Sequence, residues 1–145
     1  MNYKPATKFS AGCASYIYNA LYRLEDSLDS AIVKVSGVEF DTIVCTGISG
    51  IIFAVPLAQR LNKKIAIVRK DRDGTHSNNE IESNCFKGEF GRCLIVDDLV
   101  SSGATVKRIK RIVRKNSPKV KFVGVYLYND NYFRRGPGAG QAMFN

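Results

Sequence analysis

Apolar and polar positions follow two different patterns along this chain, and the change comes near Phe40. Before it, apolar side chains recur three or four positions apart from about Ser10 to Ser27, which predicts an amphipathic helix with one buried face. The segment from Ser27 to Ser36 either extends that helix or forms a second one. Gly37 is a typical stop for it, because glycine readily adopts the left-handed conformation that ends many helices.

After Phe40, short apolar runs alternate with segments of helical periodicity. The predicted elements are strand Thr42–Cys45, a helix from about Ile51 to Leu61, strand Ile65–Val68, a strand over Cys93–Val96, helix Val106–Lys115 and a final strand Lys119–Tyr128. This alternation predicts an α/β fold, since right-handed crossovers give a parallel sheet that helices cover on both faces. Ligands of such sheets bind at the carboxyl ends of the strands.

The stretch CLIVDDLVSSGAT, residues 93–105, is the clearest candidate for a functional site in the sequence. A buried strand delivers two adjacent carboxylates, Asp97 and Asp98, and a small hydroxyl-rich turn follows before the next helix. The turn consists of Ser101, Ser102, Gly103, Ala104 and Thr105. Its backbone N–H groups and the positive end of the helix dipole favour a phosphate, whereas the acids suit sugar hydroxyls or a magnesium ion. Together they indicate a phosphorylated ribose.

A second candidate phosphate loop follows the first predicted strand. It comprises Thr46, Gly47, Ile48, Ser49 and Gly50, and the next strand ends in two cations, Arg69 and Lys70. A dinucleotide-binding turn is disfavoured because the first glycine of its pattern is missing and the second strand ends in cations. No Walker A sequence is present, which excludes a P-loop NTPase. The two glycines could also serve only for close helix-to-strand packing.

CLIVDDLVSSGAT resembles the signature loop that binds phosphoribosyl pyrophosphate (PRPP) in the type I phosphoribosyltransferases. The resemblance implies a mostly parallel central sheet flanked by helices, a small hood built from the termini, and a flexible loop at about residues 71–91. It assigns the ribose hydroxyls to Asp97 and Asp98 and the 5′-phosphate to residues 101–105. Pyrophosphate falls to residues 46–50 with Arg69 or Lys70. Mg²⁺ is expected as cofactor, held mainly through substrate, with Asp97 and Asp98 as candidate protein ligands.

The activity implied is transfer of the 5-phosphoribosyl group of PRPP to a nitrogenous base with release of pyrophosphate. Ser101 stands where hypoxanthine-guanine enzymes carry an acid, so an orotate-like or adenine-like acceptor is favoured over a 6-oxopurine. The family commonly forms homodimers. In its flexible loop His76 is a weak catalytic candidate, since an exposed histidine is usually only solvated. Arg72 and Lys87 are further candidates to meet substrate.

Composition fits one domain over residues 1–145, with 45% hydrophobic and 24% charged residues. No apolar run reaches the roughly 20 residues that span a bilayer, and no signal-peptide segment is evident, so we expect a cytosolic protein without membrane contact. The four cysteines lack CxxC spacing, which argues against a zinc site.

The net charge of +9 is concentrated in the predicted helix over residues 107–115. A solvated face explains such a run most simply, but nucleic acid would also be attracted to it. An RNA-binding regulator on the same fold, using Arg108 and Arg111, is therefore the alternative function, and a catalytically inactive PRPP sensor is a third.

Overall fold

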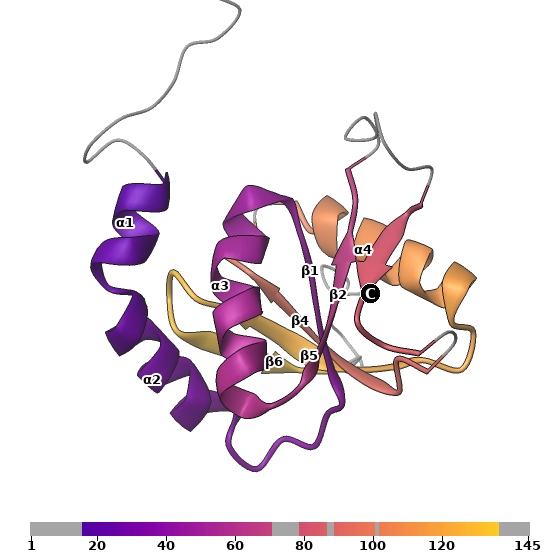
Figure 1. The fold of residues 1–145 in the computed structure, drawn as a ribbon, viewed down its shortest axis with the longest axis horizontal. Coiled ribbons are helices and arrows are strands. Elements are labelled where there is room, and N and C mark those ends of the chain that lie inside the picture. The colour runs from indigo at the N-terminus through magenta and orange to yellow at the C-terminus, as the bar shows by residue number, and fades with distance from the viewer. Residues whose placement is uncertain (1–15, 71–78, 87–88, 101, 137–145) are drawn as a thin grey trace, which may run out of the picture.

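In the computed structural model, residues 16–70, 79–86, 89–100 and 102–136 are described, and they form one mixed sheet with helices on both faces (Figure 1). The elements in chain order are α1 (Tyr16–Tyr22), α2 (Leu24–Val35), β1 (Thr42–Thr46), α3 (Gly47–Leu61), β2 (Lys64–Val68), β3 (Ile81–Ser83), β4 (Arg92–Asp97), α4 (Ala104–Asn116), β5 (Lys121–Leu127) and β6 (Tyr132–Arg135). The α/β fold class predicted from the sequence is confirmed.

The order of the strands creates a crevice in the middle of the sheet. Within the described residues the order is β3-β2-β1-β4-β5-β6, with β2, β1, β4 and β5 parallel and the two edge strands antiparallel. The chain leaves β1 towards β2 and later returns to β4 on the other side of β1. Such a reversal separates the connections at the carboxyl ends of β1 and β4, the usual ligand position in open α/β sheets. Those ends are Thr46 and Asp97.

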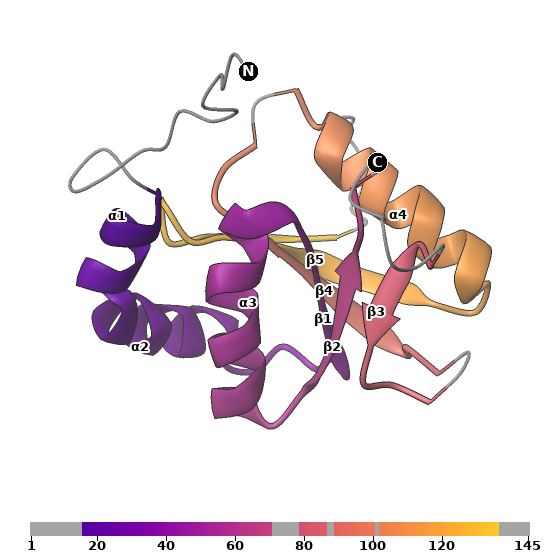
Figure 2. The ribbon, with the colours of Figure 1, turned by 45° about the horizontal axis from the view of Figure 1, so that its top comes forward.

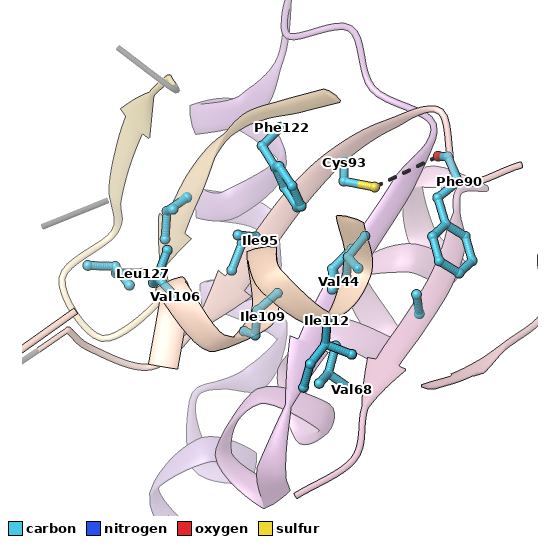
Figure 3. Packing of buried hydrophobic residues seen from close by; sticks show 13 residues of the cluster. Val44, Val68, Phe90, Cys93, Ile95, Val106, Ile109, Ile112, Phe122 and Leu127 are labelled. Atoms are coloured by element: carbon cyan, nitrogen blue, oxygen red, sulfur yellow. Dashed lines mark hydrogen bonds between the residues drawn. The ribbon is translucent and has the colours of Figure 1, made fainter. Parts of the chain in front are cut away.

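Helices α3 and α4 cover opposite faces of the sheet, and α1 and α2 pack beside α3 (Figure 2). On the α4 face, Val106 and Ile109 are fully buried against strand residues such as Ile95 (Figure 3). On the other face, Phe53 of α3 and Leu28 of α2 join a second apolar cluster. Burial of each such side chain contributes about 1.5–3 kcal/mol. In the described ranges, none of the helices has the length and apolar character needed to cross a membrane.

The amino-terminal helical region is broken in two. One helix from about Ser10 to Ser27 was one expectation, but α1 ends at Tyr22 and α2 begins at Leu24, with Arg23 between them at φ −120° and ψ 21°. Residues 10–15 lie outside the described residues. The break separates the expected apolar face, because Leu21 is 56% exposed whereas Leu28 is 2% exposed. The helical stop is confirmed, since α2 ends at Val35 and Gly37 has φ +81°.

The sequence analysis did not predict the two short edge strands, β3 and β6. β3 lies inside the segment expected to be a loop over about residues 71–91, and β6 lies in the tail beyond the strand expected to be last. Residues 71–78 of the expected loop are outside the described part. Both strands are partly exposed and have three or four residues, too few to show an alternating pattern. β6 packs over Gly124 of β5, where a side chain would collide with Phe133 and the backbone of Arg134.

The basic helix α4 does not show all of its charges to water, as the sequence led us to expect. Lys107 and Arg111 are exposed, but Lys110 is only 3% exposed. The Lys110 ammonium lies 5.7 Å from the centre of the Phe122 ring, a cation–π arrangement. Burial, and then the nearby Arg114, lowers the pKa of Lys110. One of the six cations of the helix therefore belongs to the core.

Candidate active site

A cleft of about 440 Å³ opens at the carboxyl ends of β1 and β4. Its walls come from three chain segments that are far apart in the sequence. The lining residues are Thr46, Ser49, Lys70, Asp97, Asp98, Leu99, Val100, Ser102, Gly103, Thr105, Val106 and Arg108. Both sequence-predicted phosphate segments and both acids thus meet in one cavity, as the ends of parallel neighbouring strands must.

The two acids occupy the floor where β4 ends. Asp97 is 6% exposed, and one oxygen of its carboxylate accepts a hydrogen bond from the backbone N–H of Asp98 at 2.9 Å. The carboxylate of Asp98 in turn accepts from the N–H of Leu99 at 2.8 Å. These local bonds fix the orientation of both side chains. A carboxylate offers about four acceptor sites, so each acid can accept from further hydroxyl groups.

The first phosphate segment meets the start of helix α4. Gly103 precedes the helix with φ +81°, a conformation that favours glycine. Ala104 and Thr105 belong to the first turn of the helix and not to a loop, and the hydroxyl of Ser102 accepts from the N–H of Ala104 at 3.3 Å. Ser101 lies outside the described residues. The N–H groups of this first turn have no acceptor within the helix itself, and they give the cleft an anion-binding end.

The second phosphate segment is the first turn of helix α3, where a loop was expected. The helix begins at Gly47, four residues before the predicted start. Thr46 anchors the entry, because its hydroxyl donates to the carbonyl of Val68 on β2 at 2.6 Å. Gly47 has φ +69°, and a Cβ there would lie 2.8 Å from Cε of Lys70. Glycine at this position therefore leaves room for the Lys70 side chain to cross the helix start.

Three residues of this segment, Gly47, Ile48 and Gly50, are not among those that line the cleft. Ile48 is 70% exposed. Gly50 is buried, and a Cβ there would lie 3.2 Å from Cβ of Cys45 and 3.6 Å from the carbonyl oxygen of Val96. For Gly50 the alternative explanation is therefore correct, and its small size permits close packing of α3 on the strands.

The two cations after β2 take different positions. Lys70 lines the cleft, whereas the guanidinium of Arg69 pairs with Glu82 of β3 at 3.0 Å. Arg108 of α4, which we had placed on the nucleic-acid surface, also lines the cleft and donates to the carbonyl oxygen of Arg69. The signal that could have revealed Arg108 is its spacing, three residues after Thr105 and hence on the same helical face.

Burial governs the electrostatics of the cleft floor. It raises the pKa of Asp97 from 3.8 to about 7. The hydrogen bond from the backbone N–H of Asp98 and the charge of Lys70 oppose this rise, whereas the carboxylate of Asp98 adds to it. Burial followed by the charge of Asp97 also raises the pKa of Cys45 to about 12. The thiol of Cys45 is therefore protonated at neutral pH and is not a nucleophile.

The acids also provide the donors that a magnesium ion prefers. Asp97 and Asp98 offer carboxylate oxygens in a cleft with two helix starts. Magnesium in proteins commonly binds one or two carboxylates together with substrate phosphates. The residues present therefore fit the expected ion. The remaining loop candidates, Arg72, His76 and Lys87, lie outside the described residues.

The raised pKa of Asp97 predicts how stability depends on pH. Between about pH 4 and pH 7 the folded chain holds a proton that the unfolded chain has lost, so the free energy of unfolding falls as pH rises through this window. In Asp97→Asn this dependence should disappear, and stability relative to wild type should rise by on the order of 2 kcal/mol between about pH 5 and about pH 8. Urea unfolding of the unliganded protein at several pH values measures it. Asp130→Asn, at an exposed turn, should keep the wild-type slope, and an unchanged slope in Asp97→Asn would contradict the assignment.

Known proteins resemble this chain in sequence and in fold. The family model described as "Phosphoribosyl transferase domain" matches residues 17–135. An orotate phosphoribosyltransferase of Pyrobaculum aerophilum is 32% identical over 129 residues, which are 84% of this chain and 66% of the relative. The transcriptional regulator GfcR of Methanocaldococcus jannaschii is 33% identical over 97 residues, which are 63% of this chain and 46% of the relative. The chain thus spans two thirds or less of both relatives.

The likeness extends to solved structures. The crystal structure of adenine phosphoribosyltransferase from Thermoanaerobacter pseudethanolicus superposes with a TM-score of 0.60 at 20% identity, covering 77% of this chain and 70% of that one. At this identity the superposition speaks for the fold. The family match over residues 17–135 carries the assignment, and it confirms the resemblance seen in the loop after β4. The chain belongs to the phosphoribosyltransferase domain family, of the type I class.

Proposed function

We propose that this chain transfers the 5-phosphoribosyl group of PRPP to a nitrogenous base and releases pyrophosphate, with Mg²⁺ as cofactor. The observation that carries the proposal is the meeting of an acid pair, two helix starts and two cations, Lys70 and Arg108, in one cleft. A phosphorylated sugar diphosphate needs these groups together: acceptors for its hydroxyls and separate anion sites for its two ends.

Asp97 and Asp98 bind the ribose in this proposal. Ionised carboxylates accept hydrogen bonds from the 2′- and 3′-hydroxyls, and the local bonds to the N–H groups of Asp98 and Leu99 hold them in place beforehand. The pKa of about 7 for Asp97 means that the unliganded site is partly protonated near neutral pH. Substrate should therefore bind better as pH rises above 7.

In this proposal the starts of α4 and α3 bind different phosphate groups of PRPP. The 5′-phosphate is received by the turn at Ser102 and Gly103, with Ser101 before it, and by the start of α4 at Ala104 and Thr105. The first turn of α3 with Lys70 receives pyrophosphate. Among the sequence-predicted pyrophosphate contacts, Thr46, Ser49 and Lys70 line the cleft and fit this role. Gly47 leaves room for the Lys70 side chain, and Arg69 is engaged by Glu82. Arg108 adds positive charge to the same cleft.

The reaction needs positioning and charge stabilisation more than covalent chemistry by the protein. The bond between C1 of the ribose and pyrophosphate breaks with its electron pair going to pyrophosphate, and a ring nitrogen of the base forms the new bond to C1. The ring nitrogen loses its proton to pyrophosphate or water. Bound Mg²⁺ supplies charge neutralisation on the phosphate oxygens. The acid pair stabilises the positive charge that develops on the ribose.

Removal of the acid pair should abolish transfer while the fold persists. Asp97→Asn with Asp98→Asn should lower the rate of pyrophosphate release from PRPP and a base by at least about 100-fold, because two charged contacts to the developing cation are lost. A matched control removes two carboxylates on α2, where Glu25→Gln and Asp29→Asn only disrupt exposed pairs with Arg60. Circular dichroism verifies folding. A double Asn variant that keeps wild-type activity would contradict the assignment of Asp97 and Asp98 to the ribose.

Binding of RNA is the second candidate function, and the charge of α4 is what favours it. Lys107, Arg111, Arg114 and Lys115 are exposed on a helix without acidic residues, although Lys115 pairs with Glu80 at 2.9 Å. One relative is named as a transcriptional regulator. Arg108 and Lys110 no longer belong to this surface, since one lines the cleft and the other is buried.

The salt dependence of binding separates a specific basic surface from a solvated one. If α4 binds RNA, Lys107→Ala with Arg111→Ala should weaken binding and reduce the slope of log K against log salt by about 2, roughly one for each lost phosphate contact. Lys34→Ala with Lys64→Ala removes two exposed lysines elsewhere and serves as control. Salt-insensitive or undetectable binding in filter or fluorescence assays would eliminate this function.

A further inference from the structure

Tyr128 begins the turn from β5 to β6 and lies behind the wall of the first cleft, the one at the carboxyl ends of β1 and β4. It is not among the residues that line that cleft. Instead it lines a second cleft, together with residues of α2 such as Asp26. Tyr128 can therefore act on a ligand of the first cleft only through the residues that it holds in place.

The backbone of this turn is bonded to the two acids of the first cleft. The N–H of Tyr128 donates to the carbonyl of Asp97 at 3.0 Å, and the N–H of Asn129 donates to the carbonyl of Asp98 at 3.2 Å. These bonds continue the parallel pairing of β4 and β5 beyond Leu127, the last paired residue of β5. The position of Tyr128 is thus set by the same strand end that carries the acid pair.

The side chain of Tyr128 contacts helix α3 at two points that are one turn apart. Its hydroxyl donates to the carbonyl of Ser49 at 2.6 Å. Its ring stacks on the ring of Phe53, with the ring centres 4.4 Å apart and the planes 16° apart, and Phe53 is only 1% exposed. Because its stacking partner is buried, the Tyr128 ring has little freedom to turn, and its hydroxyl stays directed at Ser49.

The first turn of α3 is thereby held at both of its ends. At its beginning the hydroxyl of Thr46 donates to the carbonyl of Val68 on β2 at 2.6 Å, and at its end Tyr128 binds the carbonyl of Ser49. Between these two anchors lie the N–H groups of residues 47–49, which have no acceptor within the helix itself. An anion at the start of a helix binds to such donors. The two anchors therefore fix the direction of the donors that would bind it.

PRPP requires a fixed spacing between the acid pair and this turn. Its pyrophosphate is attached to C1 of the ribose, next to the carbon that carries the 2′-hydroxyl, so the acids and the turn must bind groups that are a few bonds apart. The rate of transfer depends on such positioning. Tyr128 is bonded to both parts, by its backbone to Asp97 and by its hydroxyl to Ser49, and it sets the distance between them.

We propose that Tyr128 is a positioning residue, whose hydroxyl holds the first turn of α3 in the orientation that binds pyrophosphate. This inference rests on the proposed function, because it concerns the site of the leaving group in that reaction. Within the helix the carbonyl of Ser49 also accepts from the N–H four residues further on, and a carbonyl oxygen can accept two hydrogen bonds. Loss of the Tyr128 hydroxyl therefore changes the orientation of the turn more than the stability of the fold.

Removal of this one hydroxyl tests the inference, with the two halves of PRPP as probes. Calorimetric titration measures the affinity for pyrophosphate with Mg²⁺ and, separately, the affinity for ribose 5-phosphate. In Tyr128→Phe the affinity for pyrophosphate should fall about fivefold, a typical loss for one hydrogen bond, whereas the affinity for ribose 5-phosphate should stay within about twofold of wild type. General damage to the fold would weaken the binding of both probes.

Tyr126→Phe is the matched control, because it also removes a tyrosine hydroxyl from a ring beside Phe53. The hydroxyl of Tyr126 donates to the side-chain oxygen of Asn131 at 2.7 Å and not to α3. If Tyr128→Phe binds pyrophosphate as well as Tyr126→Phe does, or loses affinity equally for both probes, the inference is wrong and the proposed function stands. A wild-type chain that does not bind both probes would instead contradict the proposed function, and the inference would fall with it.

Discussion

The burial of Asp97 at the end of a central strand is the constraint on which the rest of the site depends. The strand that carries this carboxyl lies between two parallel neighbours. Burial holds the pKa of Asp97 near 7, so above neutral pH its buried charge lowers the stability of the fold. Apolar clusters on both faces of the sheet offset that cost. An ionisable group that weakens the unliganded fold and lines a cleft is typical of a binding site.

The central strands and their carboxyl ends could be predicted because burial on both faces leaves continuous apolar runs in the sequence. Thr46, Lys70, Asp97 and Ser102 meet in one cleft because parallel neighbours end at the same edge. The edge strands β3 and β6 could not be predicted, because short and half-exposed segments have no periodic pattern of apolar residues. The sequence alone also does not tell whether a given cation faces solvent, the cleft or the core, because that depends on the three-dimensional packing of the helix. Arg108 and Lys110, two residues apart in one basic run, line the cleft and the core respectively.

The β5–β6 turn contacts both the acid pair and the start of α3. Its backbone bonds to the carbonyls of Asp97 and Asp98, and the Tyr128 hydroxyl reaches the start of α3, so one short segment borders both clefts. Arg23, between α1 and α2, and Asp26 of α2 line the second cleft, of about 490 Å³, beside this turn. The carboxyl edge of the sheet therefore brings the acid pair and the two helix starts into one cleft, and this turn supports both.

Calorimetric titration with PRPP and Mg²⁺ tests the central claim most directly, because it requires no knowledge of the acceptor. The account predicts saturable binding with one site per chain, stronger above about pH 7 than below it as Asp97 ionises, and lost when both acids are changed to Asn. Absence of binding by the wild-type chain, or binding that persists with both acids removed, would contradict the identification of the first cleft.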